Sequence, residues 1–342
     1  MRFKQATILG AGMLGFANAR YMSERLPEII LYEIDPDVSS HIRETRMHKH
    51  HFSEIQLPNN VKITSNISDI SKSGLIIVDI HSAGIRSTFR ELRPYIKPGA
   101  VIVNDAKGLE ANTHKLPLEI IHEEIEDATL IARSGWMLAK NIIEGKASYA
   151  DIACRKQESA EEISRLTSSS TFYNRTSSDV TGVQLAGVMK NVYAILAGFF
   201  DGISQADAKG RKKYLQMKEA YMDAATAEAK MIGTALGGKP ETFQKNSYAW
   251  GKDFYNSCTQ QTSNRLLGEQ IGLGMTPLEA FNHVLNKTSK KPEGYHALNE
   301  LHLMAESKNI NAPILSLIYS SFLKSTGPEQ MLYKIKELII SD

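Results

Sequence analysis

The chain has 342 residues, of which 42% are hydrophobic and 23% charged, a composition typical of a soluble globular protein. Its formal net charge of +2 excludes a strong attraction to nucleic acid or to an acidic membrane surface, so neither is expected as a partner. A single core rarely grows beyond roughly 250–300 residues, so the length predicts two domains.

Short apolar runs alternate with longer amphipathic segments through the first half of the chain. Continuous Val, Ile and Leu runs such as LIIVDI are typical of strands that are buried on both faces of a parallel sheet. Strands are predicted at residues 6–10, 29–35, 61–64, 75–80, 100–105, 128–132, 149–154 and 171–175. Helices are predicted between them at 13–25, 37–47, 85–95, 117–125 and 156–166. The alternation predicts a doubly wound, Rossmann-like α/β domain over residues 1–178.

Strand signals stop after about residue 178, and long amphipathic stretches follow. Helices are predicted at 180–202, 212–236, 263–273, 277–286, 296–308, 314–323 and 328–340. The second domain, residues 179–342, is therefore expected to be all-helical, and a short hinge is expected near residues 176–181.

Features tied to cellular location are consistent with a cytoplasmic protein. Cys154 and Cys258 are far apart and lack C-x-x-C spacing, so both are expected to be free thiols in a reducing compartment. The sequence MRFKQATILGAG enters a strand and a glycine turn at once, without the pattern of a signal peptide. The apolar stretch around residues 192–200 is shorter than the ~20 residues that span a bilayer.

The turn ILGAGMLG carries the spacing Gly10-x-Gly12-x-x-Gly15 directly after the first strand. The first glycine permits the tight turn, the second lets the backbone approach a pyrophosphate, and the third allows close packing of helix and strand. The N–H groups at the start of the following helix favour an anion. A dinucleotide is therefore expected here, with Met13 and Leu14 among its contacts.

The second predicted strand ends in an acid, Glu33, about where a carboxylate meets the adenosine ribose hydroxyls. A carboxylate would repel a 2′-phosphate, so NAD(H) is favoured over NADP(H). Asp35 is the rival acid, and its place before Pro36 is more typical of a turn residue.

Lys190 and Asn191 lie within GVQLAGVMKNVYAILAGFFDG, residues 182–202, among small, branched and aromatic side chains. A lysine is almost never fully buried without a partner. One interpretation is a lysine whose stem covers the helix while its ammonium stays in water. The other is a functional lysine, which in a dry pocket can deliver a proton and take it back.

Six segments occur in an order and spacing that resemble the NAD-dependent glycerol-3-phosphate dehydrogenases. They are GAGMLG, NDAKGLE, SGWMLAKNI, GVQLAGVMKNVYAILAGFFDG, KDFYNSCTQQTSNRLLG and PEGYHALNEL. The resemblance covers nearly the whole chain. It implies a Rossmann domain followed by a helical domain, and hydride transfer between nicotinamide and the pair glycerol 3-phosphate and dihydroxyacetone phosphate.

The resemblance also assigns residues. It implies Lys190 as general acid and base, with Lys107, Asn191 and Asp253 as further catalytic residues. Substrate binding is implied for Lys107, Ser257, Asn264 and Arg265, and contact with the cofactor for Ser82 and Glu293. Ser257 stands where the family has threonine and keeps a hydroxyl. A homodimer is implied as well.

Departures from the family pattern cluster at the substrate and nicotinamide side. Ser263 replaces the first arginine of the family's R-N-R motif, Trp136 and Met137 replace a proline and a hydroxyl residue, and His81 replaces a proline. The alternative substrate is therefore a related small anionic ketone, such as a 2-oxoalkylphosphonate or a carboxylate ketone. A catalytically inactive NAD-binding regulator would lack the catalytic cations, yet Lys107 and Lys190 are present.

The histidines of MHKHHF, His48, His50 and His51, lie between the second and third predicted strands. No carboxylate or cysteine is spaced to complete a metal site with them, so no metal is expected.

Overall fold

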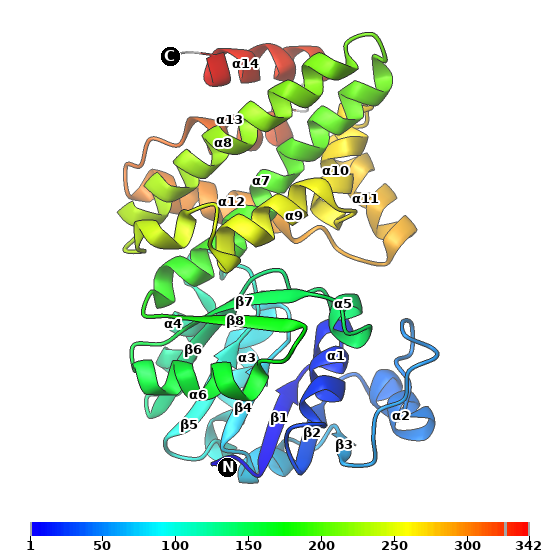
Figure 1. Cartoon of the computed structure of the whole chain (residues 1–342), viewed down its shortest axis with the longest axis vertical. Coiled ribbons are helices and arrows are strands. Elements are labelled where there is room, and N and C mark those ends of the chain that lie inside the picture. Colours follow the sequence, from blue (N-terminus) through cyan, green and yellow to red (C-terminus); the bar gives the residue numbers. More distant parts are fainter. Residues whose placement is uncertain (1, 325–326, 341–342) are drawn as a thin grey trace. The chain divides into compact units, whose positions relative to one another are not determined.

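The computed structural model describes residues 2–324 and 327–340, and the chain forms two compact units (Figure 1). The first contains the residues up to Lys107 together with Lys115–Val180, and the second contains Gly108–His114 and the residues from Thr181 on. The first unit is an α/β fold and the second is helical, which confirms the predicted fold class. Nothing in the sequence indicated that the segment after Lys107 folds with the second unit.

The first unit is built on an eight-stranded sheet in the order β3-β2-β1-β4-β5-β6-β7-β8. Neighbouring strands are parallel except β6 and β7, whose antiparallel pairing was not predicted. Strand β1 lies between β2 and β4, so the sheet has its switch point at the carboxyl end of β1, where ligands bind in open α/β sheets. The strands are β1 (Gln5–Leu9), β2 (Glu28–Tyr32), β3 (Val61–Thr64), β4 (Leu75–Val78), β5 (Ala100–Asn104), β6 (Ala128–Ser134), β7 (Ser148–Ala153) and β8 (Phe172–Ser177).

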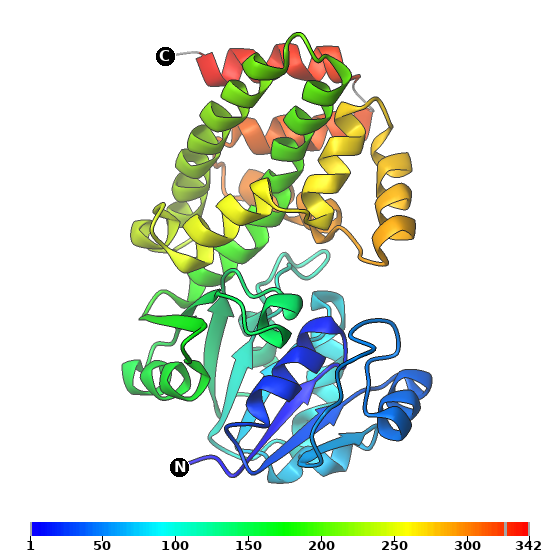
Figure 2. The ribbon, with the colours of Figure 1, turned by 45° about the vertical axis from the view of Figure 1, so that its right-hand side comes forward.

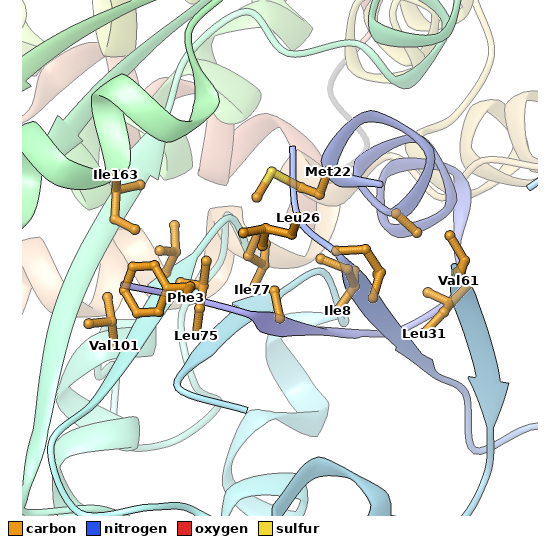
Figure 3. Packing of buried hydrophobic residues seen from close by; sticks show 14 of the residues in the cluster. Phe3, Ile8, Met22, Leu26, Leu31, Val61, Leu75, Ile77, Val101 and Ile163 are labelled. Atoms are coloured by element: carbon orange, nitrogen blue, oxygen red, sulfur yellow. The ribbon is translucent and has the colours of Figure 1, made fainter. Parts of the chain in front are cut away.

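Helices pack on this sheet through a continuous apolar core. Figure 3 shows Ile8, Leu31 and Ile77 of the central strands packed with Met22 of α1 and Leu26 beyond it. The helices are α1 (Met13–Met22), α2 (Pro36–Thr45), α3 (Ile85–Leu92), α4 (Pro117–Glu124), α5 (Ala139–Ile143) and α6 (Gln157–Thr167). Shorter 3₁₀ turns lie at Ile67–Lys72, Ser82–Gly84 and Arg93–Tyr95. Helix α5 was not predicted, because five residues are too few to show a helical period.

The second unit is organised around α7, with α8 running beside it in Figures 1 and 2. Its helices are α7 (Val180–Ala206), α8 (Arg211–Ala235), α9 (Asp253–Thr259), α10 (Ser263–Gly272), α11 (Pro277–Thr288), α12 (Glu293–Ser307), α13 (Pro313–Lys324) and α14 (Pro328–Ile340). A 3₁₀ turn at Pro240–Phe243 and a π-helical turn at Tyr248–Lys252 precede α9, and neither these turns nor α9 were predicted.

By length and composition alone α7 could cross a membrane, since it has 27 residues and a window of mean hydropathy 1.4. The expectation that this apolar stretch is too short is therefore wrong. However, 94% of that window is buried inside the protein, as in the core helix of a folded domain.

Glycines allow α7 and α10 to touch backbone to backbone. A Cβ atom on Gly198 would lie 1.9 Å from the carbonyl oxygen of Arg265, and one on Gly268 would lie 1.7 Å from that of Ile195. Such separations are impossible for a real side chain, so glycine is required at both positions. The contact fixes the start of α10 against the middle of α7.

Candidate active site

The predicted glycine turn joins β1 to α1 in the first unit. Gly10 has φ +95°, and a Cβ there would lie 2.8 Å from the carbonyl oxygen of Asp79. A Cβ on Gly15 would lie 1.9 Å from the carbonyl oxygen of Gly10, whereas one on Gly12 would meet nothing within 4 Å. Helix α1 begins at Met13 with no side-chain cap and no acid in its first turn. Tight packing at two glycines, open space at the third and an uncapped helix start suit the approach of a pyrophosphate.

Glu33 lies beside this turn at the end of β2. Its carboxylate accepts hydrogen bonds from the backbone N–H of Ala11 at 2.7 Å and of Asp35 at 2.9 Å. Asp35 is the N-cap of α2, where it accepts from the N–H groups of Asp37 and Val38. The geometry thus assigns the two acids different positions, one at the glycine turn and one at a helix start.

The remaining first-unit candidates lie after β4, β5 and β6. Ser82 begins a 3₁₀ turn after β4, and the side chain of His81 caps that turn. Lys107 follows β5, and its ammonium donates to the carbonyl oxygen of Gly135 at 2.8 Å. The side chains that replace the family pattern beside Gly135, Trp136 and Met137, are both buried.

In the second unit Lys190 is buried in α7 with 9% of its surface exposed. Its ammonium lies 3.1 Å from Asp253 Oδ1 and donates to Ser257 Oγ at 3.1 Å. Asp253 and Ser257 are one turn apart on α9, so both face the lysine, and the Ser257 hydroxyl donates to Asp253 at 3.4 Å. The π-helical turn directly before Asp253 is a feature often found at functional sites.

A chain of amide contacts lies next to this lysine. Asn264 Nδ2 donates to Asn191 Oδ1 at 2.9 Å, and Asn191 Nδ2 donates to Glu293 Oε2 at 3.1 Å. The N–H of Gly294 donates to Asn264 Oδ1 at 2.8 Å. The structure thus places the predicted second-unit residues in two groups of contacts. Ser257 lies with Lys190 and Asp253, and Asn191 lies with Asn264 and Glu293. The contacts tie the starts of α10 and α12 to the middle of α7.

Arg265 of α10, predicted to bind substrate, is paired with a different part of α7. Its Nε donates to Asp201 Oδ2 at 2.7 Å, and its Nη2 lies 3.6 Å from Glu269. Lys218 of α8 binds both oxygens of Asp201, at 2.8 and 2.7 Å. Asp201 follows Lys190 by about three helical turns. The pairing with Asp201 therefore does not favour direct binding of Arg265 to a ligand that is bound at Lys190.

Matches to known families cover both units. The sequence model described as "NAD-dependent glycerol-3-phosphate dehydrogenase N-terminus" matches residues 5–160, and the one described as the C-terminus matches residues 179–333. The chain belongs to the NAD-dependent glycerol-3-phosphate dehydrogenases. The recognition from motif order is therefore confirmed, and the protein is an NAD(P)-dependent oxidoreductase that acts on CH–OH groups.

Curated relatives of this dehydrogenase align along nearly their whole length. One from Clostridium acetobutylicum, named glycerol-3-phosphate dehydrogenase (NAD(P)+), is 27% identical over 331 residues, which are 96% of each chain. One from Moorella thermoacetica with the same name is 29% identical, covering 93% of this chain and 91% of its own. Among solved structures, the glycerol-3-phosphate dehydrogenase of Coxiella burnetii shares the fold with a TM-score of 0.87 at 21% identity, over 98% of each chain.

The other reactive side chains of the dehydrogenase are its two cysteines and the histidines around His48. Cys154 and Cys258 are free and buried, and burial raises the pKa of both thiols. His48 Nδ1 accepts from the N–H groups of His50 and His51, and burial lowers the pKa of His48 to about 4. Among residues 2–324 and 327–340, no three or more His, Cys, Asp or Glu side chains are grouped so that they could hold a metal ion.

Sequence reasoning missed Asp201, which pairs with Arg265 in the dehydrogenase fold, and Lys218, which pairs with the same carboxylate. The signal for Asp201 was available, since FFDG places an acid in the same apolar helix as Lys190. Its partner on α8 could not be chosen from the neighbouring cations Lys212 and Lys213 without the fold.

Proposed function

We propose that this dehydrogenase interconverts glycerol 3-phosphate and dihydroxyacetone phosphate with NAD(H), and that Lys190 is its general acid and base. The observation that carries the proposal is the buried contact of the Lys190 ammonium with Asp253 and Ser257. The named relatives support glycerol 3-phosphate, and they give no support to the phosphonate or carboxylate alternatives.

When bound, NADH would supply the hydride for ketone reduction, and NAD+ would accept it in the reverse direction. Negative charge then develops on the carbonyl oxygen, and a positioned donor must neutralise it. Lys190 gives that oxygen a proton during reduction and takes it back during oxidation. The carboxylate of Asp253 holds the ammonium in place and offsets part of the cost of burying its charge.

We propose that Asn191, whose amide is oriented by Asn264 and Glu293, is a second donor near the reacting oxygen. Lys107 is proposed for the same task because its K-G-L-E segment matches the family. Asn264 and the hydroxyl of Ser257 are proposed to contact substrate. The start of α10 carries no acid in its first turn and therefore suits a phosphate. Arg265 would contribute its positive charge to phosphate binding there while its side chain stays paired with Asp201.

We further propose that NAD(H) is preferred over NADP(H). The Glu33 carboxylate lies against the N–H of Ala11 in the glycine turn, so its charge is close to the site proposed for the adenosine ribose. Gly10, Gly12 and Gly15, with the N–H groups of Met13 and Leu14, would hold the pyrophosphate, and Ser82 and Glu293 are proposed as further contacts. A higher kcat/KM with NADH than with NADPH would agree, and equal values would contradict the assignment.

Steady-state reduction of dihydroxyacetone phosphate by NADH tests the substrate. Turnover at a kcat/KM of at least about 10⁴ M⁻¹s⁻¹ agrees with the proposal, because that is the lower end for natural substrates. Negligible turnover of dihydroxyacetone phosphate, with rapid reduction of a 2-oxoalkylphosphonate, would replace it with the alternative.

A cytoplasmic homodimer is proposed from the family resemblance. Large apolar side chains exposed on the second unit give it some support, and they include Leu215, Met231, Tyr255 and Leu278. Light scattering coupled to gel filtration measures the assembly directly, and a mass near 38.0 kDa would contradict a dimer.

A further inference from the structure

Four polar side chains lie together beneath the glycine turn, and the proposed mechanism uses none of them. They are Asn18 of α1, Asp79 after β4, Asp105 after β5 and Arg133 of β6. Asn18, Asp105 and Arg133 are only 1%, 4% and 2% exposed. Asp79 is partly buried as a residue, but its carboxyl oxygen Oδ1 is shielded from solvent. Buried polar and charged groups are stable only when they are paired, so the partners of these four side chains matter.

The contacts divide unequally between the two acids. Arg133 donates to both oxygens of Asp105, with Nε at 2.7 Å from Oδ1 and Nη2 on Oδ2. Asn18 Nδ2 donates to Asp105 Oδ2 at 3.2 Å and to Asp79 Oδ2 at 2.8 Å. Among the described residues Asp79 Oδ1 has no hydrogen-bond partner. Asp105 therefore receives three donors, and Asp79 receives one, which it shares.

Two acids and one guanidinium in a dry cluster leave one negative charge without a partner if both acids are ionised. An ionised carboxylate needs several donors when buried, and Asp79 lacks them. Burial raises the pKa of Asp79 well above its usual range, and the charge of Asp105 raises it further, against the opposing effects of Arg133 and Asn18. The charged groups facing Asp79 are thus Asp105 and Arg133, and Tyr21 of α1 faces Arg133.

Asp79 also forms part of the support of the turn itself. Its N–H donates to the carbonyl oxygen of Leu9 at 2.9 Å, which continues the pairing of β4 with β1. A Cβ on Gly10 would lie 2.8 Å from the Asp79 carbonyl oxygen, and one on Gly15 would lie 3.3 Å from Asp79 Cβ. Any shift of Asp79 therefore moves the turn.

We propose that Asp79 and Asp105 hold one proton between them, so that the cluster they form with Arg133 and Asn18 is neutral overall, and that this neutral cluster positions the Gly10–Gly15 turn for an anionic dinucleotide. Asp79 is the protonated partner and Asp105 the ionised one. A neutral cluster suits this position, because a further negative charge below the turn would repel the pyrophosphate. The inference rests on the proposed seat of the cofactor at this turn, and it makes Asp79 a positioning residue.

Two substitutions at Asp79 separate the effect of its proton on NADH binding from the effect of its packing. Asp79→Asn keeps a neutral group of the same shape, so the Kd for NADH, measured by fluorescence titration, should stay within about twofold. Asp79→Ala leaves the Asn18 amide without this partner and the turn without its support. The KM and Kd for NADH should then rise about tenfold while kcat stays within about twofold, since losing a buried partner is costly.

An infrared difference spectrum between wild type and Asp79→Asn at neutral pH reports the proton directly. A carboxylic-acid carbonyl band in the wild type that disappears in Asp79→Asn is the expected result. Absence of that band, or equal weakening of NADH binding by Asp79→Asn and Asp79→Ala, would overturn the proposal. Glu126→Gln, at an exposed acid, is the matched control and should leave both readouts unchanged.

The two measurements also distinguish a failure of this inference from a failure of the proposed function. NADH binding and the infrared band need no ketone, so both can be as expected even if dihydroxyacetone phosphate is not turned over. If Asp79→Ala fails to fold, the band and the affinity of Asp79→Asn still decide.

Discussion

Asp201 is the single carboxylate on which Lys218 and Arg265 converge, with all three side chains at most 16% exposed. Asp201→Asn removes its charge while keeping its shape and one acceptor oxygen. The amide cannot accept from Lys218 and Arg265 with both of its former oxygens, because one position now carries donor hydrogens. Two buried cations would then face each other without their counter-ion.

The expected loss of stability is that of removing one partner from a buried ion pair. Such changes cost about 3–5 kcal/mol, because the remaining charge stays buried and uncompensated. Glu269, 3.6 Å from Arg265 Nη2, compensates only part of this, so the lower half of that range is expected. For a unit of this size the loss corresponds to roughly 6–16 °C in Tm.

Urea unfolding of Asp201→Asn, Lys218→Met and the double variant measures the effect. Removing Lys218 first leaves only one cation on Asp201, so Asp201→Asn should cost less in that background, with a coupling energy of about 1–3 kcal/mol. A loss below about 1 kcal/mol in the single variant, or strict additivity in the double variant, would refute the account of this cluster.

Three further outcomes are expected. Gly268→Ala should lower the free energy of unfolding by about 1–3 kcal/mol, because its Cβ would lie 1.7 Å from the carbonyl oxygen of Ile195. Gly327→Ala, whose Cβ would meet nothing within 4 Å, is the control, and equal effects of the two would contradict the packing argument. His48 has a folded-state pKa of about 4 against 6.5, so it stays neutral on folding while the unfolded chain takes up a proton, and stability falls as pH drops from 6.5 towards 4. In urea unfolding His48→Gln should remove roughly 3 kcal/mol of that fall, and an unchanged pH profile would count against it. Glu33→Ser should raise the NADPH-to-NADH ratio of kcat/KM by about tenfold in steady-state assays, and an unchanged ratio would show that this carboxylate does not select the cofactor.

Elements with a strong local pattern were predictable from the sequence, and short ones were not. Strands such as β4 and β5 follow continuous apolar runs, and α7 and α8 are long enough to show their period. Helix α9 has only seven residues and lies behind a π-helical turn, so no period was visible. Its D-x-x-x-S spacing nevertheless carried the information that Asp253 and Ser257 share a face.

Residue pairs far apart in the chain limited the prediction of the site. Arg265 looked like an anion-binding residue, and its partner Asp201 is 64 residues away. Asp79 and Asp105 were visible as the last residues of LIIVD and AVIVND, but only the sheet order makes β4 and β5 neighbours. Sequence reasoning can identify a side chain that needs a partner, whereas the fold determines which one it obtains.

The central claim is that Lys190 provides the proton in the reaction. The most direct test is kcat for reduction of dihydroxyacetone phosphate by NADH in Lys190→Met, beside Lys212→Met as an exposed control on α8. General acid–base catalysis contributes about 10²–10⁴-fold, so kcat should fall by that factor in Lys190→Met, with NADH affinity and the control unchanged. A Lys190→Met enzyme that keeps kcat within about tenfold of wild type would contradict the assignment.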